Sequence, residues 1–438
     1  MVSELVLRGG TVIRHHDAYR ADVRVAEGRI VQVAPSIDAT GGARVIDARG
    51  CWIGPALVDL HAHLREPGLE AAETIDSGAR AAAVGGYGAV VAMPNTEPAL
   101  DSVALVAFVL ARGATTGIDV AVAGAITQGR RGEKLAPIAE MAALGVRLFT
   151  DDGAGVASAE VMRRALRYAA PLGVRLAQHC EEPSMVQDGT MNDGPLAGRL
   201  GLVGRPALAE ELMVLRDLEL VRATGAKMHF LHLSTARAIG LVAAARREGL
   251  DVTAEVAPHH FTLDESACSD YDPLFKVNPP LRSLADVAAL RAALRAGDVD
   301  AVATDHAPHA PESKDLAFDE APAGMLGLEH AAALTLEALG GEEADAHQFF
   351  SLLSRRPAAI AQLRAGDARV ALSAHGGEVA EGEDANVVVF DPRESWTVDR
   401  ERLQSRARNT PYHARTLRGR ARATIVRGRL VAYDGEAL

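Results

Sequence analysis

Histidine and aspartate side chains recur along the chain at the ends of short apolar segments, where they could bind a metal ion. The clearest group is "DLHAHLREPG", residues 59–68, in which two histidines stand two residues apart. Imidazole nitrogens and carboxylate oxygens are common zinc ligands, so the pattern predicts a metal centre assembled from distant parts of the chain. The candidate ligands are His61, His63, Asp152, His179, His232 and Asp305.

Each of these residues has a simpler explanation when it is taken alone. An isolated HxH pair is often accidental, an Asp-Asp-Gly sequence such as 151–153 usually forms a turn, and single histidines mostly pack in cores. Together the residues end five different apolar segments, which favours a shared metal site. The other histidines lack this placement. We assign six of them to surface or packing positions, namely His15, His16, His229, His347, His375 and His413. The roles of His259 and His260 stay open.

Eight short apolar segments alternate with helical patterns through the middle of the chain, and this alternation predicts the fold. The segments cover residues 56–62, 87–93, 118–126, 146–151, 174–180, 227–233, 251–257 and 299–305. Eight such units over about 300 residues predict an α/β fold, a parallel (β/α)₈ TIM-type barrel, with a doubly wound open sheet as the alternative. One intervening helix should begin after Ser283 and end at Gly297, and another should span residues 234–249 in the same way.

A barrel of this kind would bring the candidate ligands together. Such barrels keep their chemistry at the carboxyl ends of the strands, which is where these residues stand. Side chains alternate along a strand, so His61 and His63 should both point into the barrel mouth.

The two ends of the chain have a different pattern, with short strands separated by glycine turns. Neither end is long enough to form a core alone. We therefore expect residues 1–53 and 368–438 to form one small composite β-sandwich domain, with the barrel, residues 54–367, inserted between them.

Composition excludes several classes of function. The net charge is −12 and no long basic run occurs, which argues against nucleic acid as a partner. No apolar run reaches the roughly 20 residues that span a bilayer, so we expect no membrane partner. The three cysteines, Cys51, Cys180 and Cys268, are far apart and form no CxxC motif, which favours a reducing cytoplasm over a disulfide framework.

Seven motifs in the barrel region and one near the C-terminus carry a resemblance to a known family. They are "GPALVDLHAHLREPG", "AMPNTEP", "FTDDGAGV", "HCE", "HLST", "KVNPPLR", "ATDHAPH" and "DANVVVFDP". The chain resembles the amidohydrolase superfamily and, within it, the class I dihydroorotases. "HLREPG" and "NPPLR" separate this branch from generic amidohydrolases. The resemblance implies zinc and the reversible cyclisation of N-carbamoyl-L-aspartate to L-dihydroorotate in pyrimidine biosynthesis.

The resemblance also implies a role for each matching residue. His61, His63 and Asp305 match the ligands of a first zinc ion, His179 and His232 match those of a second, and Asp152 matches the bridge between them. Asp305 also matches the catalytic proton carrier. Substrate contacts match at His63, Arg65, Asn95, Asn278, His309 and the backbone of Ala323 and Gly324, and the alanine at 323 departs from a bulkier expected residue.

Two rival functions follow from the same motifs. Hydantoinases, allantoinases and dihydropyrimidinases are related cyclic amidohydrolases, but they use a carboxylated lysine between the metals, and "GVRLFTDDG" contains none. A non-catalytic scaffold for aspartate carbamoyltransferase is the second rival, and the complete ligand set argues against it. A homodimer, and association with that carbamoyltransferase in addition to catalysis, stay open as assemblies.

Overall fold

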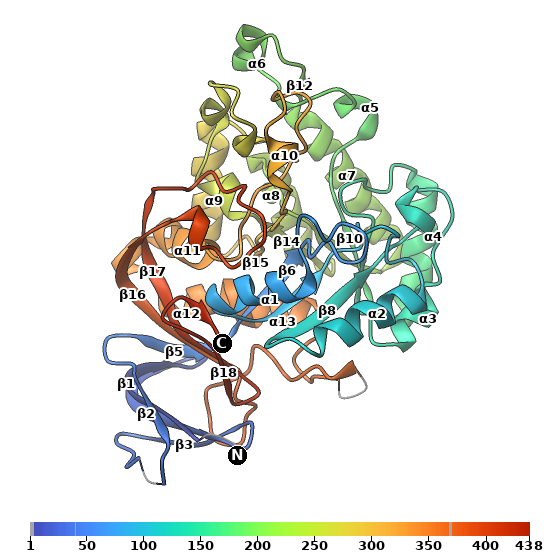
Figure 1. The fold of residues 1–438 in the computed structure, drawn as a ribbon. Helices are drawn as coiled ribbons and strands as arrows, with labels where there is room; N and C mark the ends of the chain where they lie inside the picture. Colours follow the sequence, from blue (N-terminus) through green and yellow to red (C-terminus); the bar gives the residue numbers. More distant parts are fainter. Residues whose placement is uncertain (1–3, 40, 368–369) are drawn as a thin grey trace.

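The barrel consists of eight parallel strands around one axis (Figure 1). The computed structural model describes residues 4–39, 41–367 and 370–438. The strand order is β15-β14-β13-β10-β9-β8-β7-β6. Their bounds are β6 (Leu57–Ala62), β7 (Tyr87–Ala92), β8 (Asp119–Gly124), β9 (Leu148–Thr150), β10 (Arg175–Gln178), β13 (Lys227–Phe230), β14 (Val252–Val256) and β15 (Ala301–Val302). Each strand lies inside a predicted apolar segment, so the predicted barrel is confirmed.

The seam between β6 and β15 is closed mainly by side chains. The backbone N–H and the hydroxyl of Thr304 donate to the two carboxylate oxygens of Asp59, at 2.8 and 2.7 Å. One backbone bond, from His63 N to the His306 carbonyl at 2.8 Å, adds to them. The first and last strands are thus tied directly beneath the residues expected to bind metal.

Helices surround the strands on the outside of the barrel (Figure 1). The main ones are α1 (Ile75–Val84), α2 (Val103–Gly113), α3 (Ile138–Ala143), α4 (Ala159–Ala169), α7 (Ala207–Thr224), α8 (Ala236–Arg247), α9 (Leu284–Ala296), α11 (Ala331–Leu339), α12 (Ala346–Phe350) and α13 (Arg356–Ile360). Short 3-10 turns are η1 (Gln128–Arg130), η2 (Ala170–Leu172), η3 (Pro258–Phe261), η4 (Glu265–Cys268), η5 (Pro273–Phe275), η6 (Gly341–Glu343) and η9 (Arg400–Arg402), and η7 (Ser351–Arg355) is a π-helix.

Both helices whose bounds the sequence predicts are present in the structure. Ser283 caps α9 by accepting from the Asp286 N–H, and Gly297 ends it with φ 77°, as predicted. Helix α8 begins one residue later than the pattern indicated, because Thr235 is its N-cap, and it ends at Arg247 with Glu248 rather than Gly249 as its C-cap. The hydroxyl of Ser234 instead donates to the buried carboxylate of Glu210.

Both chain ends contribute to a second, nine-stranded sheet. Its strands are β1 (Leu5–Ile13), β2 (Ala18–Ala26), β3 (Arg29–Ala34), β4 (Arg44–Asp47), β5 (Trp52–Pro55), β16 (Val387–Thr397), β17 (Thr416–Val426), β18 (Arg429–Tyr433) and β19 (Glu436–Ala437). Strand β5 joins the two halves, because it pairs with β1 on one side and β16 on the other. These strands pack around a core of their own, as expected of the small β-sandwich.

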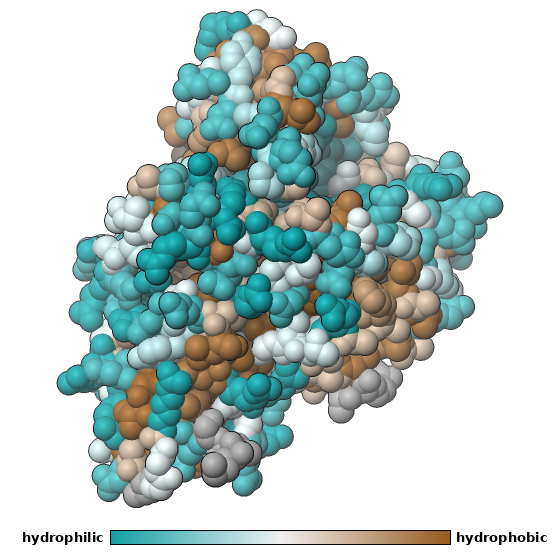
Figure 2. All heavy atoms as spheres, viewed as in Figure 1, coloured by the Kyte–Doolittle hydropathy of each residue, from teal (hydrophilic) through white to brown (hydrophobic). Residues whose placement is uncertain are grey.

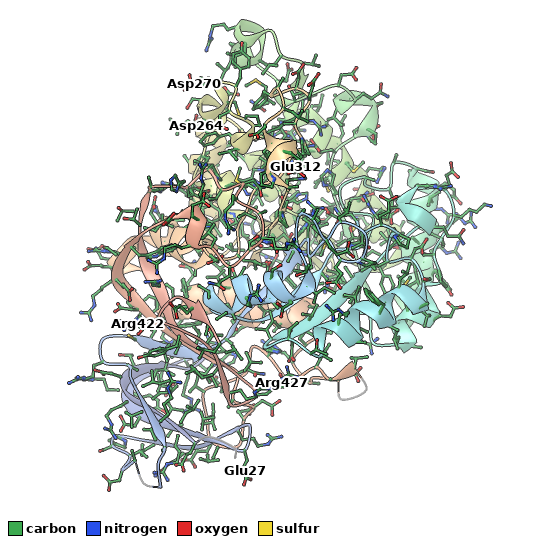
Figure 3. All side chains as sticks on the ribbon, viewed as in Figure 1. Glu27, Asp264, Asp270, Glu312, Arg422 and Arg427 are labelled. Atoms are coloured by element: carbon green, nitrogen blue, oxygen red, sulfur yellow. The ribbon has the colours of Figure 1, made fainter. Side chains whose placement is uncertain are left out.

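Long loops rise above the carboxyl ends of the barrel strands. The loop after β10 contains α5 (Pro183–Val186), β11 (Met191–Asn192), α6 (Pro195–Leu200) and β12 (Gly204–Arg205), and the loop after β15 contains α10 (Pro311–Lys314). Figure 3 labels Asp264 and Asp270 on the loop after β14 and Glu312 on α10, all far from Arg422, Arg427 and Glu27 in the terminal sheet. These loops share a small apolar core that includes Met191, Val277 and Phe318.

The viewed surface is mostly hydrophilic, with a hydrophobic patch over α2 and another near the terminal sheet (Figure 2). On α2, Val103 and Phe108 are exposed. Among the described residues, no helix combines the length and the apolar character that a bilayer crossing requires.

Candidate active site

Asp152 lies between two pairs of histidines at the barrel mouth. Its Oδ2 atom is 3.3 Å from His61 Nε2 and 3.5 Å from His63 Nε2. Its Oδ1 atom is 3.5 Å from His179 Nδ1 and 3.4 Å from His232 Nε2. One carboxylate oxygen therefore faces each histidine pair, which is the arrangement that a bridge between two cations requires.

Asp305 joins the side of the cluster that holds the HxH pair. Its Oδ1 atom is 3.2 Å from His63 Nε2 and 3.6 Å from His61 Nε2. The backbone has positive φ at Asp305, 46°, and at His232, 30°. Such conformations are costly for residues with a side chain and concentrate at functional sites.

The burial of the cluster fits a bound metal. Asp152 and His61 are buried, yet Asp152 Oδ1 and His61 Nε2 make no hydrogen bond within the described residues. A buried polar atom without a partner costs about 1–3 kcal/mol, and a cation beside each of these two atoms would satisfy it. Burial by itself raises the pKa of the Asp152 carboxyl, but the neighbouring imidazoles of His61, His179 and His232 hold that pKa well below its usual range. The donor set of imidazoles and carboxylates suits a divalent metal.

Three residues hold the outer nitrogens of the histidines. Glu255 Oε1 lies 2.9 Å from His61 Nδ1, and Glu181 Oε2 lies 3.0 Å from His179 Nε2. Asn95 Oδ1 accepts from His63 Nδ1 at 2.7 Å. Partners of this kind fix the tautomer and the orientation of metal-binding histidines.

Glu255 and Glu181 were missed by the sequence analysis, although each left a signal. Glu255 is the one charged residue inside the apolar run of β14, and Glu181 follows His179 by two positions. Glu255 also accepts from His229, whose Nε2 lies 2.9 Å from Oε2. His229 is therefore a buried residue that packs beside the site, in keeping with its assignment from the sequence.

The two histidines left open by the sequence lie next to the cluster. His259 Nε2 is 3.9 Å from Asp305 Oδ2 and makes no hydrogen bond within the described residues. His260 Nε2 donates to the Pro279 carbonyl at 2.9 Å and so anchors the loop that contains Asn278.

Asp151, the neighbour of the bridging candidate, is directed away from the cluster. It accepts from the backbone N–H groups of Ile126 and Thr127, at 2.9 and 3.0 Å, and from the Thr127 hydroxyl. It therefore holds the loop after β8 and does not face the histidine pairs.

The candidate substrate residues surround the same mouth. Arg65 is buried, and its Nε–H donates to the Pro308 carbonyl at 3.1 Å, which leaves its terminal amino groups for a ligand. His309 Nε2 donates to the Ala323 carbonyl at 2.8 Å. Gly324 has φ 138°, and a Cβ there would lie 2.7 Å from the Ala307 Cβ, so the loop requires glycine.

Asn278 borders an adjacent cavity of about 550 Å³. The cavity is also lined by Arg205 and Lys276 and by Asp188 and Asp319, so its wall carries two cationic and two anionic side chains. Asn278 Oδ1 is buried without a hydrogen-bond partner in the described part of the chain. Burial lowers the pKa of Arg65 to about 10, which leaves its guanidinium charged at neutral pH. The buried, charged Arg65 at the mouth therefore favours an anionic ligand.

Comparison with known proteins agrees with this geometry. Residues 50–238 match a family model described as "Dihydro-orotase-like". Similar full-length proteins named "Dihydroorotase" come from Anaeromyxobacter dehalogenans strain 2CP-C, at 46% identity over 100% of both chains, and from Pelotomaculum thermopropionicum, at 44% over 98% of this chain and 99% of that one. One from Mycobacterium tuberculosis H37Rv is 42% identical over 99% of both.

Solved structures support the fold alone. L-hydantoinase (dihydropyrimidinase) from Arthrobacter aurescens superposes with a TM-score of 0.85 at 22% identity, over 100% of this chain and 98% of that one. A dihydropyrimidinase from Brevibacillus agri NCHU1002 gives 0.83 at 23%, over 99% and 96%. The full-length sequence matches go further than this shared barrel. They show that the chain belongs to the dihydroorotase family, within the metal-dependent amidohydrolases.

Proposed function

We propose that the protein is a dihydroorotase, which interconverts N-carbamoyl-L-aspartate and L-dihydroorotate in pyrimidine biosynthesis. The observation that carries the proposal is the position of Asp152 between two histidine pairs, with Asp305 and Arg65 at the same mouth. The names of the full-length relatives support the same substrate.

We propose two zinc ions as the metals, from the imidazole and carboxylate donors. His61, His63 and Asp305 would hold one, His179 and His232 the other, and Asp152 would bridge them. When bound, such a metal pair would lower the pKa of water at the site and polarise the ring carbonyl. Asp305 would accept the proton of the attacking water and return it to the departing ring nitrogen.

Recognition of the substrate is assigned to the surrounding polar groups. Arg65 would bind the substrate carboxylate through its planar fork. Asn95 has its oxygen engaged by His63, so its amide N–H₂ group is the part that would reach the substrate. The remaining contacts would come from His63, Asn278, His309 and the backbone of Ala323 and Gly324.

We also propose the wider setting of the enzyme. Residues 1–53 and 368–438 would form one domain and residues 54–367 the barrel, a division supported by the pairing of β5 with β1 and β16. The three cysteines are buried and unpaired, which supports a cytoplasmic location. A homodimer and association with aspartate carbamoyltransferase are the assemblies to test, by light scattering with and without the carbamoyltransferase.

The test of function compares three substrates on one preparation of known metal content. Dihydroorotate should be hydrolysed far faster than dihydrouracil or hydantoin, because those two rings carry no carboxylate for Arg65. Comparable rates on all three would instead indicate a broad cyclic amidase, the rival that the solved structures of similar fold represent.

A further inference from the structure

A segment of the terminal sheet region reaches the active-site loops. Residues 403–412, here called the strap, leave the sheet after β16 and return to it at β17, passing beside α11 (Figure 1). The Gln404 N–H donates to Glu329 at 2.8 Å, and the Arg406 N–H donates to Glu73 at 3.0 Å. The Tyr412 hydroxyl bonds to Thr262 at 2.8 Å. The strap is therefore attached to loops that follow three different barrel strands.

Asn409 is the strap residue closest to the candidate substrate contacts. Its Nδ2 donates to the carbonyls of Ala307, at 2.9 Å, and Gly324, at 3.1 Å. Its Oδ1 accepts from the His309 N–H at 3.1 Å. The side chain is 3% exposed, so these bonds are made out of contact with water. Both N–H donors of the carboxamide are in use, which leaves no room for a different orientation.

These bonds lie where the two arms of the loop 306–326 meet. The Ala307 N–H donates to the Met325 carbonyl at 2.9 Å, and the Leu326 N–H donates to the Asn409 carbonyl at 3.1 Å. Pro308, between the two clamped residues, supplies the carbonyl that holds Arg65. Asn409 thus helps to fix the positions of His309 and Gly324 directly, and that of Arg65 through the Pro308 carbonyl.

We propose that Asn409 is a positioning residue for substrate binding, through which the terminal sheet region completes the substrate site. The inference rests on the proposed function, because it takes His309, Gly324 and Arg65 as substrate contacts. A carboxamide is required because the site needs two donors and one acceptor. An aspartate has the same shape, but it would place a charged oxygen against two carbonyl oxygens and lose both donors.

The test uses Asn409→Asp with Asn386→Asp as the matched control. Asn386 is also buried, and its Nδ2 donates to Ser373 Oγ and to the Ala374 carbonyl, both at 2.7 Å. Its Oδ1 accepts from the Arg427 N–H at 2.7 Å. The two asparagines have the same bonding pattern, but Asn386 lies in the terminal region and touches none of residues 306–326.

Asn409→Asp should raise the KM for dihydroorotate by about tenfold or more, because one or two buried hydrogen bonds are lost. The change in kcat should be smaller, and the metal content should not change. Hydrogen exchange should accelerate in the peptide 306–326. Asn386→Asp should lower the melting temperature while leaving both KM and that exchange as in the wild type. If Asn409→Asp does not fold, Asn409→Ser, which keeps one donor, should show the same rise in KM.

Equal KM values and equal exchange for Asn409→Asp and Asn386→Asp would overturn the inference. A wild-type protein that leaves dihydroorotate intact would instead refute the proposed function. In that case the exchange comparison still decides whether Asn409 orders the loop.

Discussion

Glu255 connects two histidines inside the barrel, and its substitution gives the first prediction. In Glu255→Gln, the amide N–H₂ group must face either His61 or His229, where an imidazole N–H now donates. One of the two bonds is then lost, and metal affinity should fall by about 10–100-fold. Competition with a chelator measures this directly.

A second buried glutamate provides the control for that experiment. Glu210 accepts from the backbone N–H groups of Ser234 and Thr235 and bonds to no imidazole. Glu210→Gln should lower stability without the same loss of metal. Equal metal affinity in the two variants would show that Glu255 only supports the fold.

The two adjacent aspartates provide the second prediction. Asp152→Ala should lose at least one metal ion and nearly all activity, because it removes the group between the two histidine pairs. Asp151→Ala should keep its metal and lose about 1–3 kcal/mol of stability, since the Ile126 and Thr127 N–H groups lose their acceptor. Metal analysis and urea unfolding of both variants separate the two roles.

The same site predicts independence from carbon dioxide. An unmodified carboxylate at 152 needs no carboxylation, so metal-free protein should regain activity with zinc in buffer stripped of bicarbonate. A requirement for bicarbonate, or loss of metal from the Asp151 variant, would reverse the assignment.

At the scale of the element, Lys314 holds the loop that contains α10. Its Nζ donates to the carbonyls of Pro273, at 2.9 Å, and Pro322, at 2.7 Å. Burial, followed by the charge of Lys276, lowers the pKa of Lys314 from 10.5 to about 7. Between about pH 7 and pH 10.5 the unfolded chain therefore binds more protons than the folded chain. The contribution of Lys314 to the free energy of unfolding increases with pH across this range.

The third prediction compares wild type with Lys314→Met by urea unfolding at about pH 7 and about pH 10. The difference in stability should move in favour of the wild type at the higher pH, because the cost of a buried charge then disappears. A difference that does not change with pH would mean that Lys314 is solvated in the folded protein.

The elements differ in how far their sequence reveals them. The barrel strands were predictable because each is a short apolar run, and the candidate ligands because they end those runs. Asn409 was not, because its partners are backbone groups 85 to 102 residues away, and no spacing in the chain encodes such contacts. The start of α8 was misplaced because both Ser234 and Thr235 suit an N-cap. Both hydroxyls donate to the buried Glu210, but it is the Thr235 hydroxyl that also accepts from the Ala238 N–H.

On the scale of the whole molecule, the barrel and the terminal sheet depend on each other. Trp52 packs against Phe349 and Phe390, with ring centroids 5.6 and 5.9 Å apart, and so joins β5, α12 and β16. The buried Glu73 of the barrel bonds to Ser405 and Arg406 of the strap. Removing the terminal strands would expose apolar rings and take two partners from the buried Glu73 carboxylate, which would keep its bonds to Ser77 and His306.

The fourth prediction is that residues 54–367, expressed alone, do not form a stable barrel. Thermal unfolding followed by circular dichroism should show no cooperative transition, in contrast to the full-length chain. A fragment that unfolds cooperatively and binds metal like the full chain would show that the barrel is independent.

The seam between β6 and β15 has a consequence for how the enzyme is made. Asp59 and Thr304, whose bonds close the barrel, are 245 residues apart, so the ribosome releases one long before the other. Asp305 follows Thr304 directly, and the proposed proton carrier therefore emerges together with the residue that completes the barrel. A nascent chain that stops short of this point already contains both histidine pairs and Asp152, yet it has neither a closed wall nor a group to move the proton. Unfinished copies would therefore have no means of turning over substrate.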